Sequence, residues 1–116
     1  MYKNTIETVI AKQDIHDTIM RYARAIDRAD GPLLHSCYWA IEEHGSSYTG
    51  PAHDYIDGAM ERLMKGDVMM HLAGNIHVEL EGDTAWVETY LLTFARFKKD
   101  GEDWDTLTGG RVFDKF

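Results

Sequence analysis

The sequence has 116 residues and a formal net charge of −8, with 44% hydrophobic and 28% charged residues. This is the composition of one folded domain with a single core, and its negative charge disfavours a nucleic-acid backbone or an anionic membrane as partner. The one cysteine, Cys37, excludes a disulfide framework, and no stretch is apolar for long enough to be a signal peptide or a membrane span. We therefore expect one cytoplasmic domain, residues 1–116, that binds neither nucleic acid nor membrane.

Helical periodicity dominates the first half of the chain. Over residues 5–27 apolar side chains recur at spacings of three and four, which predicts one long helix. Pro32 is expected in the first turn of a second, short helix that runs to about Tyr38. Residues 39–49 are mixed and predict a short strand and a turn, and residues 50–66 predict a third helix. The apolar stripe of this third helix is Ile56, Ala59, Met60, Leu63 and Met64.

Beyond residue 66 the period changes from helical to strand-like. The run "DVMMHLAGNIHVELEGDTAWVETYLLTFARF" predicts strands on either side of a turn at "EGD", and "GEDWDTLTGGRVFDKF" predicts a further turn and strand. Helices followed by strands indicate an α+β fold, with helices on one face of a mostly antiparallel sheet. A sheet curved around the long first helix would leave a pocket for a small ligand.

His71 is the histidine with the least polar surroundings. It lies in the apolar run "VMMHLAG", so its ring is expected to point inward, either as a core histidine bonded to a backbone carbonyl or as a general base. Polar contexts place four other histidines at the surface: His16, His35, His44 and His53. No set of residues has the spacing of a zinc site, so we expect no metal.

Asp27 occupies an unfavourable position, the last turn of the predicted first helix. A carboxylate there opposes the helix dipole at a cost of roughly 0.3–1 kcal/mol. It could form a surface ion pair with Arg24 or Arg28. Tyr22 lies on the apolar stripe of the same helix and could be an ordinary core residue. Five residues rotate a helix by roughly 140°, so Asp27 and Tyr22 could instead line two sides of one cavity.

The expected cavity lining comes from several elements. Asn75 could add a polar group to it, or could form a bulge or turn beside Gly74, which is the favoured interpretation. The other lining residues that we expect are Ile26, Met60, Leu63 and Trp86.

Three segments together resemble one known family. The segments "IMRYARAIDRAD…LLHSCYWA", "MMHLAGNIHVELEGDTAWVETY" and "GGRVFDKF" are similar to the SnoaL-like branch of the nuclear-transport-factor-2-like superfamily, over nearly the whole chain. The resemblance implies a cone-shaped α+β barrel, usually oligomeric, and a cofactor-free lyase that uses an Asp–His pair. It assigns the base to His71 and the orienting acid to Asp27. A dehydratase of the superfamily also has a tyrosine five positions before its aspartate, which Tyr22 matches.

The resemblance implies a dehydratase-like lyase or isomerase that needs no cofactor. Its substrate would be a small, apolar, hydroxylated molecule such as a steroid, polyketide or aromatic. Two other classes stay open: a non-catalytic small-molecule binder, and an assembly subunit of the same fold. We also expect a homodimer or homotrimer, because the strand-rich half carries more large apolar side chains than a small one-sided sheet needs. These include Trp86, Tyr90, Phe94 and Phe97.

The chain departs from the family pattern at two places. Relatives usually continue after the "GGR…D.F" strand with a turn and one more strand, which often carries an arginine that faces the pocket. This chain ends at Phe116, so we expect that strand to be missing, in either a shortened relative or an incomplete chain. A Pro-Asp step common around "CYWAIEEHG" is also absent.

Overall fold

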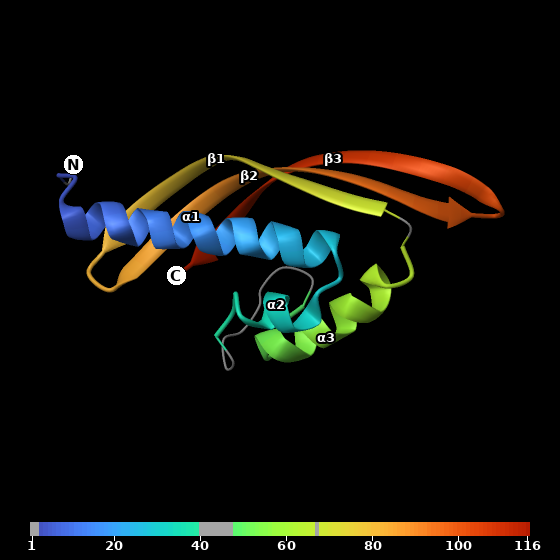
Figure 1. The fold of residues 1–116 in the computed structure, drawn as a ribbon, viewed down its shortest axis with the longest axis horizontal. Helices are drawn as coiled ribbons and strands as arrows, with labels where there is room; N and C mark the ends of the chain where they lie inside the picture. The colour runs from blue at the N-terminus through green and yellow to red at the C-terminus, as the bar shows by residue number, and fades with distance from the viewer. Residues whose placement is uncertain (1–2, 40–47, 67) are drawn as a thin grey trace.

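The computed structural model describes residues 3–39, 48–66 and 68–116. Three helices come first: α1 (Ile6–Asp27), α2 (Gly31–His35) and α3 (Ala52–Leu63). Three strands follow: β1 (Val68–Glu81), β2 (Thr84–Lys99) and β3 (Glu102–Lys115). The strands form one antiparallel sheet in the order β1-β2-β3, which curves over α1 (Figure 1). The α+β fold, with its long first helix on a curved antiparallel sheet, is confirmed.

The helices are shorter than their sequence patterns predicted. α1 begins one residue later than predicted because Thr5 is its N-cap. The Thr5 hydroxyl accepts a hydrogen bond from the Thr8 amide, and the Thr8 hydroxyl accepts one from the Thr5 amide. α2 ends at His35 rather than near Tyr38. At this end of α2, the Ser36 hydroxyl donates to the Leu33 carbonyl at 2.6 Å. The strand and turn expected over 39–49 fall mostly on residues outside those described, as does His44.

Two tight turns and one bulge set the register of the sheet. The β2–β3 turn has positive φ at both Asp100 (54°) and Gly101 (78°), the geometry that favours a two-residue hairpin. Along β1 the register shifts between Ala73 and Ile76, so Gly74 and Asn75 form a bulge. The bulge keeps both halves of β1 facing α1.

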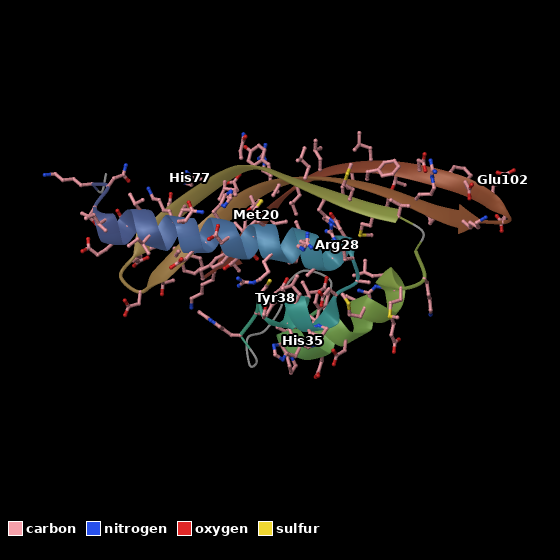
Figure 2. The ribbon with its side chains drawn as sticks, in the orientation of Figure 1. Met20, Arg28, His35, Tyr38, His77 and Glu102 are labelled. Carbon is pink, nitrogen blue, oxygen red and sulfur yellow. The ribbon has the colours of Figure 1, made fainter. Side chains whose placement is uncertain are left out.

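One face of the sheet packs on α1 and the other is open to solvent. Ala85, Val87 and Thr89 of β2 are buried on the inner face, beneath α1. Trp86 and Tyr90, which alternate with them, lie on the outer face and are 49% and 41% exposed. The β2–β3 hairpin extends beyond the helices, and Glu102 lies at its tip (Figure 2).

One apolar cluster holds α1 against the sheet, and a second joins the helices to one another. Ile15 and Ile19 of α1 pack with Ala85 and Val87 of β2. At the other end of α1, three almost fully buried residues, Ala25, Leu34 and Ile56, join the three helices. The second cluster packs the helices together near the C-terminal end of α1, where Asp27 meets His71 of β1.

Candidate active site

The Asp27 carboxylate binds His71 through both its ring and its backbone. Asp27 Oδ1 lies 2.7 Å from His71 Nδ1, and the two carboxylate oxygens accept the His71 backbone amide at 3.0 and 3.1 Å. β1 is an edge strand, so this amide donates to Asp27 rather than to a neighbouring strand. The side chains are only 10% (His71) and 19% (Asp27) exposed. The contact therefore holds the imidazole in one orientation, shielded from bulk water.

This contact dictates which nitrogen of His71 carries the proton. An ionised carboxylate only accepts hydrogen bonds, so Nδ1 must be the donor. A neutral imidazole then has its lone pair on Nε2. Nε2 has no hydrogen-bond partner among the described residues, and His71 lines a cavity. The arrangement leaves an oriented base at that cavity.

The sequence left two other interpretations open: a core histidine bonded to a backbone carbonyl, and a surface ion pair of Asp27 with an arginine. Neither describes the geometry of these residues. His71 is held by a carboxylate and not by a backbone carbonyl. Within the described residues, the ion pair of Asp27 is with His71 rather than with Arg24 or Arg28. Three hydrogen bonds from His71 to the carboxylate offset the unfavourable position at the end of α1.

Tyr22 stands beside the His71 ring. Their ring centroids are 6.5 Å apart and the planes meet at 73°, an edge-to-face arrangement. Burial, with smaller contributions from the neighbouring Tyr55 and Asp114, raises the pKa of Tyr22 to about 12. The phenol is therefore a neutral hydrogen-bond donor at pH 7.

The raised pKa of Tyr22 predicts a loss of stability at high pH. Between pH 10 and about 12 the unfolded chain loses the Tyr22 proton while the folded chain keeps it, so the free energy of unfolding falls as pH rises. Denaturant unfolding at about pH 9 and about pH 11 should show this decline, and Tyr22→Phe should reduce it. An equal decline in the wild type and the variant would contradict the prediction.

A cavity of about 310 Å³ adjoins the Asp27–His71 pair and lies between α1, α3 and β1. Ile26 and Leu63, two of the lining residues that we expected, lie along it. Met60 is not among the lining residues; it packs against the cluster of Ala25, Leu34 and Ile56. Most of the lining is apolar or aromatic, and Arg62 adds a positive charge.

Two residues expected in the pocket lie elsewhere. Trp86 is on the outer face, half-exposed, with its indole nitrogen donating to Glu81 at 3.4 Å. Side chains alternate along a strand, so burying Ala85 and Val87 turns Trp86 away from α1. Asn75 is exposed in the β1 bulge, the interpretation that the sequence favoured, and lines a separate hollow with Tyr90.

Seven lining residues of this cavity were not among the predicted site residues: Leu34, Tyr38, Tyr55, Ile56, Ala59, Arg62 and Met69. Tyr38 follows α2 and lies below α1 in the view of Figure 2. Met69 precedes His71 by two positions, and this strand periodicity could have identified it. Tyr55 lies one position before Ile56 and Arg62 one before Leu63, so their side chains flank the apolar stripe of α3 rather than forming it.

A second cavity, of about 180 Å³, shares Tyr22 and Tyr38 with the first as lining residues. The two tyrosine rings meet edge-to-face, with centroids 6.4 Å apart. Burial raises the pKa of Tyr38 as well. Two neutral phenols therefore line both the cavity beside His71 and the cavity that Thr89 lines.

The described residues bring no three histidine, cysteine or acidic side chains together in a way that could hold a metal ion. The expectation of a metal-free, cofactor-free site stays a prediction. In the same part of the chain, no helix combines the length and apolarity needed to cross a membrane.

The fold and the sequence can be compared with known proteins. The model of the SnoaL-like domain matches residues 7–116. The chain belongs to this family. The resemblance seen in the three sequence segments is thereby confirmed. No curated protein matches the sequence of this SnoaL-like domain.

Solved structures share the fold at low sequence identity. A candidate scytalone dehydratase from Novosphingobium aromaticivorans superposes with a TM-score of 0.81 at 18% identity, over 93% of this chain and 74% of that one. A nuclear transport factor 2-like superfamily protein from Salmonella enterica gives 0.76 at 21%, over 93% and 80%. Hexachlorocyclohexane dehydrochlorinase LinA-type3 from Novosphingobium barchaimii gives 0.64 at 15%, over 96% and 93%. At these identities the likeness establishes the nuclear-transport-factor-2-like fold.

Proposed function

We propose that this SnoaL-like domain is a cofactor-independent lyase of the dehydratase type. The observation that carries the proposal is the 2.7 Å contact between Asp27 and His71 Nδ1, which leaves Nε2 as a base at an apolar cavity. Solved structures of the same fold include a candidate scytalone dehydratase and a dehydrochlorinase, both named for eliminations.

The reaction is the loss of water from a β-hydroxy ketone. His71 Nε2 removes the proton on the carbon between the carbonyl and the hydroxyl-bearing carbon, and the electron pair moves onto the carbonyl oxygen as an enolate. Tyr22 donates a hydrogen bond to that oxygen. The enolate then expels the β-hydroxyl, which takes the proton from His71 and leaves as water. Asp27 stays ionised throughout and stabilises the transient imidazolium.

The cavity indicates the class of substrate. Its lining is mostly apolar and aromatic, so a small ring compound with few polar groups fits it best. Arg62 lies in the same lining and can meet a carbonyl or hydroxyl oxygen at the cavity edge. We propose a hydroxylated polyketide, steroid or aromatic precursor.

The simplest test uses 3-hydroxy-1-tetralone, which loses water to give 1-naphthol. We expect the wild type to accelerate this conversion above the buffer rate, as followed by naphthol fluorescence. Binding of the tetralone without acceleration would contradict the lyase proposal and favour a ligand-binding protein with the same pocket.

We also propose that a second copy of this chain covers the outer face of the sheet. The accessible surface is 8417 Å² for a 13.3 kDa chain, against about 6,400 Å² for a compact monomer of this mass. The radius of gyration, 15.7 Å, likewise exceeds the about 13 Å of a compact domain. The excess is larger than the roughly 800 Å² that each partner buries in a standard interface. Exposed outer-face residues include Met70, Leu72, Tyr90, Leu92 and Leu107.

Light scattering should therefore find a dimer or trimer at tens of micromolar. Leu92→Lys puts a charge at the centre of the outer face and should give a monomer, because a buried, unpaired ammonium is costly. Thr106→Lys, an exposed residue on the inner face of the hairpin, is the matched control and should leave the assembly unchanged. A monomeric wild type would refute the proposal.

A further inference from the structure

We propose that Arg62 binds a carboxylate group of the substrate, at the edge of the cavity beside His71. This inference rests on the proposed function, which places the reacting carbon of the substrate at His71 Nε2. It narrows the substrate class to hydroxylated ketones that also carry an acid. It makes Arg62 a residue that determines specificity, separate from the base and its orienting acid.

Arg62 lies on the face of α3 that meets this cavity. Tyr55, Ala59 and Arg62 all line the cavity, and their spacings of four and three place them on one face of the helix. The guanidinium folds back along this face over Gly58, where an added Cβ would lie 3.9 Å from Arg62 Nη1. The charged end of Arg62 is therefore one helical turn before its own backbone, in the direction of Tyr55.

The Arg62 guanidinium makes no hydrogen bond or ion pair with the residues that the structure describes. A helix offers side-chain partners three and four positions away. In and after α3 these positions hold Gly58, Ala59, Lys65 and Gly66, and none of their side chains can accept a hydrogen bond. A guanidinium carries only donors, and the exposed Arg62 gives them to water. A ligand with acceptor oxygens can replace that water.

The charges around the cavity favour a carboxylate as that ligand group. Arg62 is permanently charged, and none of the described lining residues is an acid. Asp27 lies behind His71, with its oxygens bound to the ring and the backbone amide of that residue. An anionic group is therefore disfavoured beside the base and favoured at Arg62. A carboxylate matches one guanidinium in charge and accepts two parallel hydrogen bonds from it, whereas a phosphate dianion would keep one charge unbalanced.

The positions of Arg62 and His71 give the substrate an orientation. Arg62 belongs to α3 and His71 to β1, and the cavity lies between these elements. A ring compound can therefore place its ketone beside Tyr22 and His71 and its carboxylate at Arg62. The chain as a whole has a formal net charge of −8, which repels an anionic ligand. A preference for the carboxylate would thus depend on the local cation.

The test compares two ligands of nearly equal shape that differ in charge, 1-tetralone-6-carboxylate and 1-tetralone-6-carboxamide. We expect the wild type to bind the carboxylate more tightly at about pH 7, as measured by isothermal titration calorimetry. Arg62→Gln should reduce this preference about 2- to 10-fold, the range between an exposed ion pair and a charge-assisted hydrogen bond. Arg62→Lys keeps the charge without the planar fork, so it should retain part of the preference.

Arg24→Gln is the matched control. Arg24 is an exposed arginine of α1 that lines neither of the two cavities, so this variant should retain the full preference. An unchanged preference in Arg62→Gln would overturn the inference, and so would an equal loss in Arg24→Gln. A wild type that binds neither tetralone, or that prefers the carboxamide, would overturn it as well.

The assay needs no turnover, so it is separable from the test of the lyase proposal. A preference that depends on Arg62 in a protein without elimination activity would contradict only the proposed function. Elimination activity together with a preference independent of Arg62 would contradict only this inference.

Discussion

His71→Ala should lower the turnover of 3-hydroxy-1-tetralone by about 10²- to 10⁴-fold, the contribution of a positioned general base. Among the described residues, His71 Nε2 is the base that is oriented at the cavity beside Tyr22, because Asp27 holds Nδ1 at 2.7 Å. Steady-state kinetics would measure the loss, and circular dichroism would establish that the variant is folded. A folded variant with full turnover would exclude His71 as the base.

Asp27→Asn should cause a loss of similar size. The amide can donate to Nδ1, which would favour the opposite tautomer and put the proton on Nε2, where the base must be free. Its oxygen can still accept the His71 backbone amide, so the fold should be kept. The double variant should be hardly worse than either single one, because the two residues act as a unit. If the loss in the double variant equals the product of the two single-variant losses, the residues act independently.

The chain contains a matched control for this pair. His35 Nε2 lies 2.8 Å from Asp57 Oδ1, a second Asp–His contact. His35 lies on the side of α2 away from α1 (Figure 2) and lines neither of the two cavities. His35→Ala should therefore leave turnover unchanged. A loss equal to that of His71→Ala would mean that removing any histidine–aspartate contact impairs the protein.

Tyr22→Phe is expected to have the next largest effect, a fall in kcat of about 10²- to 10³-fold. The substitution keeps the ring beside His71 and Tyr38 and removes only the hydroxyl that would bind the enolate oxygen. Charge on this oxygen develops mainly in the transition state, so KM should change much less than kcat. The binding of 1-tetralone should be nearly unaffected for the same reason.

Tyr90→Phe removes a hydroxyl from the outer face and serves as the control for this substitution. It should leave both constants as they are. If Tyr22→Phe changed KM and left kcat unchanged, Tyr22 would bind substrate without stabilising the enolate, and the donor role would have to be abandoned.

The family resemblance implied that Asp27 and His71 would pair, and the sequence also breaks local rules at both positions. An acid at the end of a helix opposes the dipole, and a histidine in an apolar strand resists burial, so each needs a partner. The order of helices and strands then allowed the end of α1 to reach β1. The contact explains both anomalies at once.

The face of β2 could not be assigned from the sequence. Both alternating sets in "TAWVETYLL" contain apolar residues, and the large side chain of Trp86 favoured the wrong interpretation of which set is buried. The inner face carries the smaller Ala85, Val87 and Thr89 because α1 lies close against it. Large apolar side chains are normally expected to be the buried ones. In β2 the small side chains lie beneath the helix and the large ones lie on the open face.

The remaining cavity residues depend on how the helices pack. Tyr55 and Arg62 reach the cavity because Ile56 is buried between α1 and α2, which turns one edge of α3 toward β1. Periodicity identifies the buried stripe of a helix but not the neighbour that its edges meet.

The most direct test of the Asp27–His71 base is hydrogen exchange on 1-tetralone, which has the acidic carbon but no leaving group. In D₂O, ¹H NMR would follow the replacement of the C2 protons by deuterium, and so would report proton removal without elimination. We predict that the wild type accelerates this exchange, that His71→Ala and Asp27→Asn abolish the acceleration, and that His35→Ala retains it. Exchange at the buffer rate in the wild type, or acceleration that survives in His71→Ala, would contradict the assignment of His71 as the base.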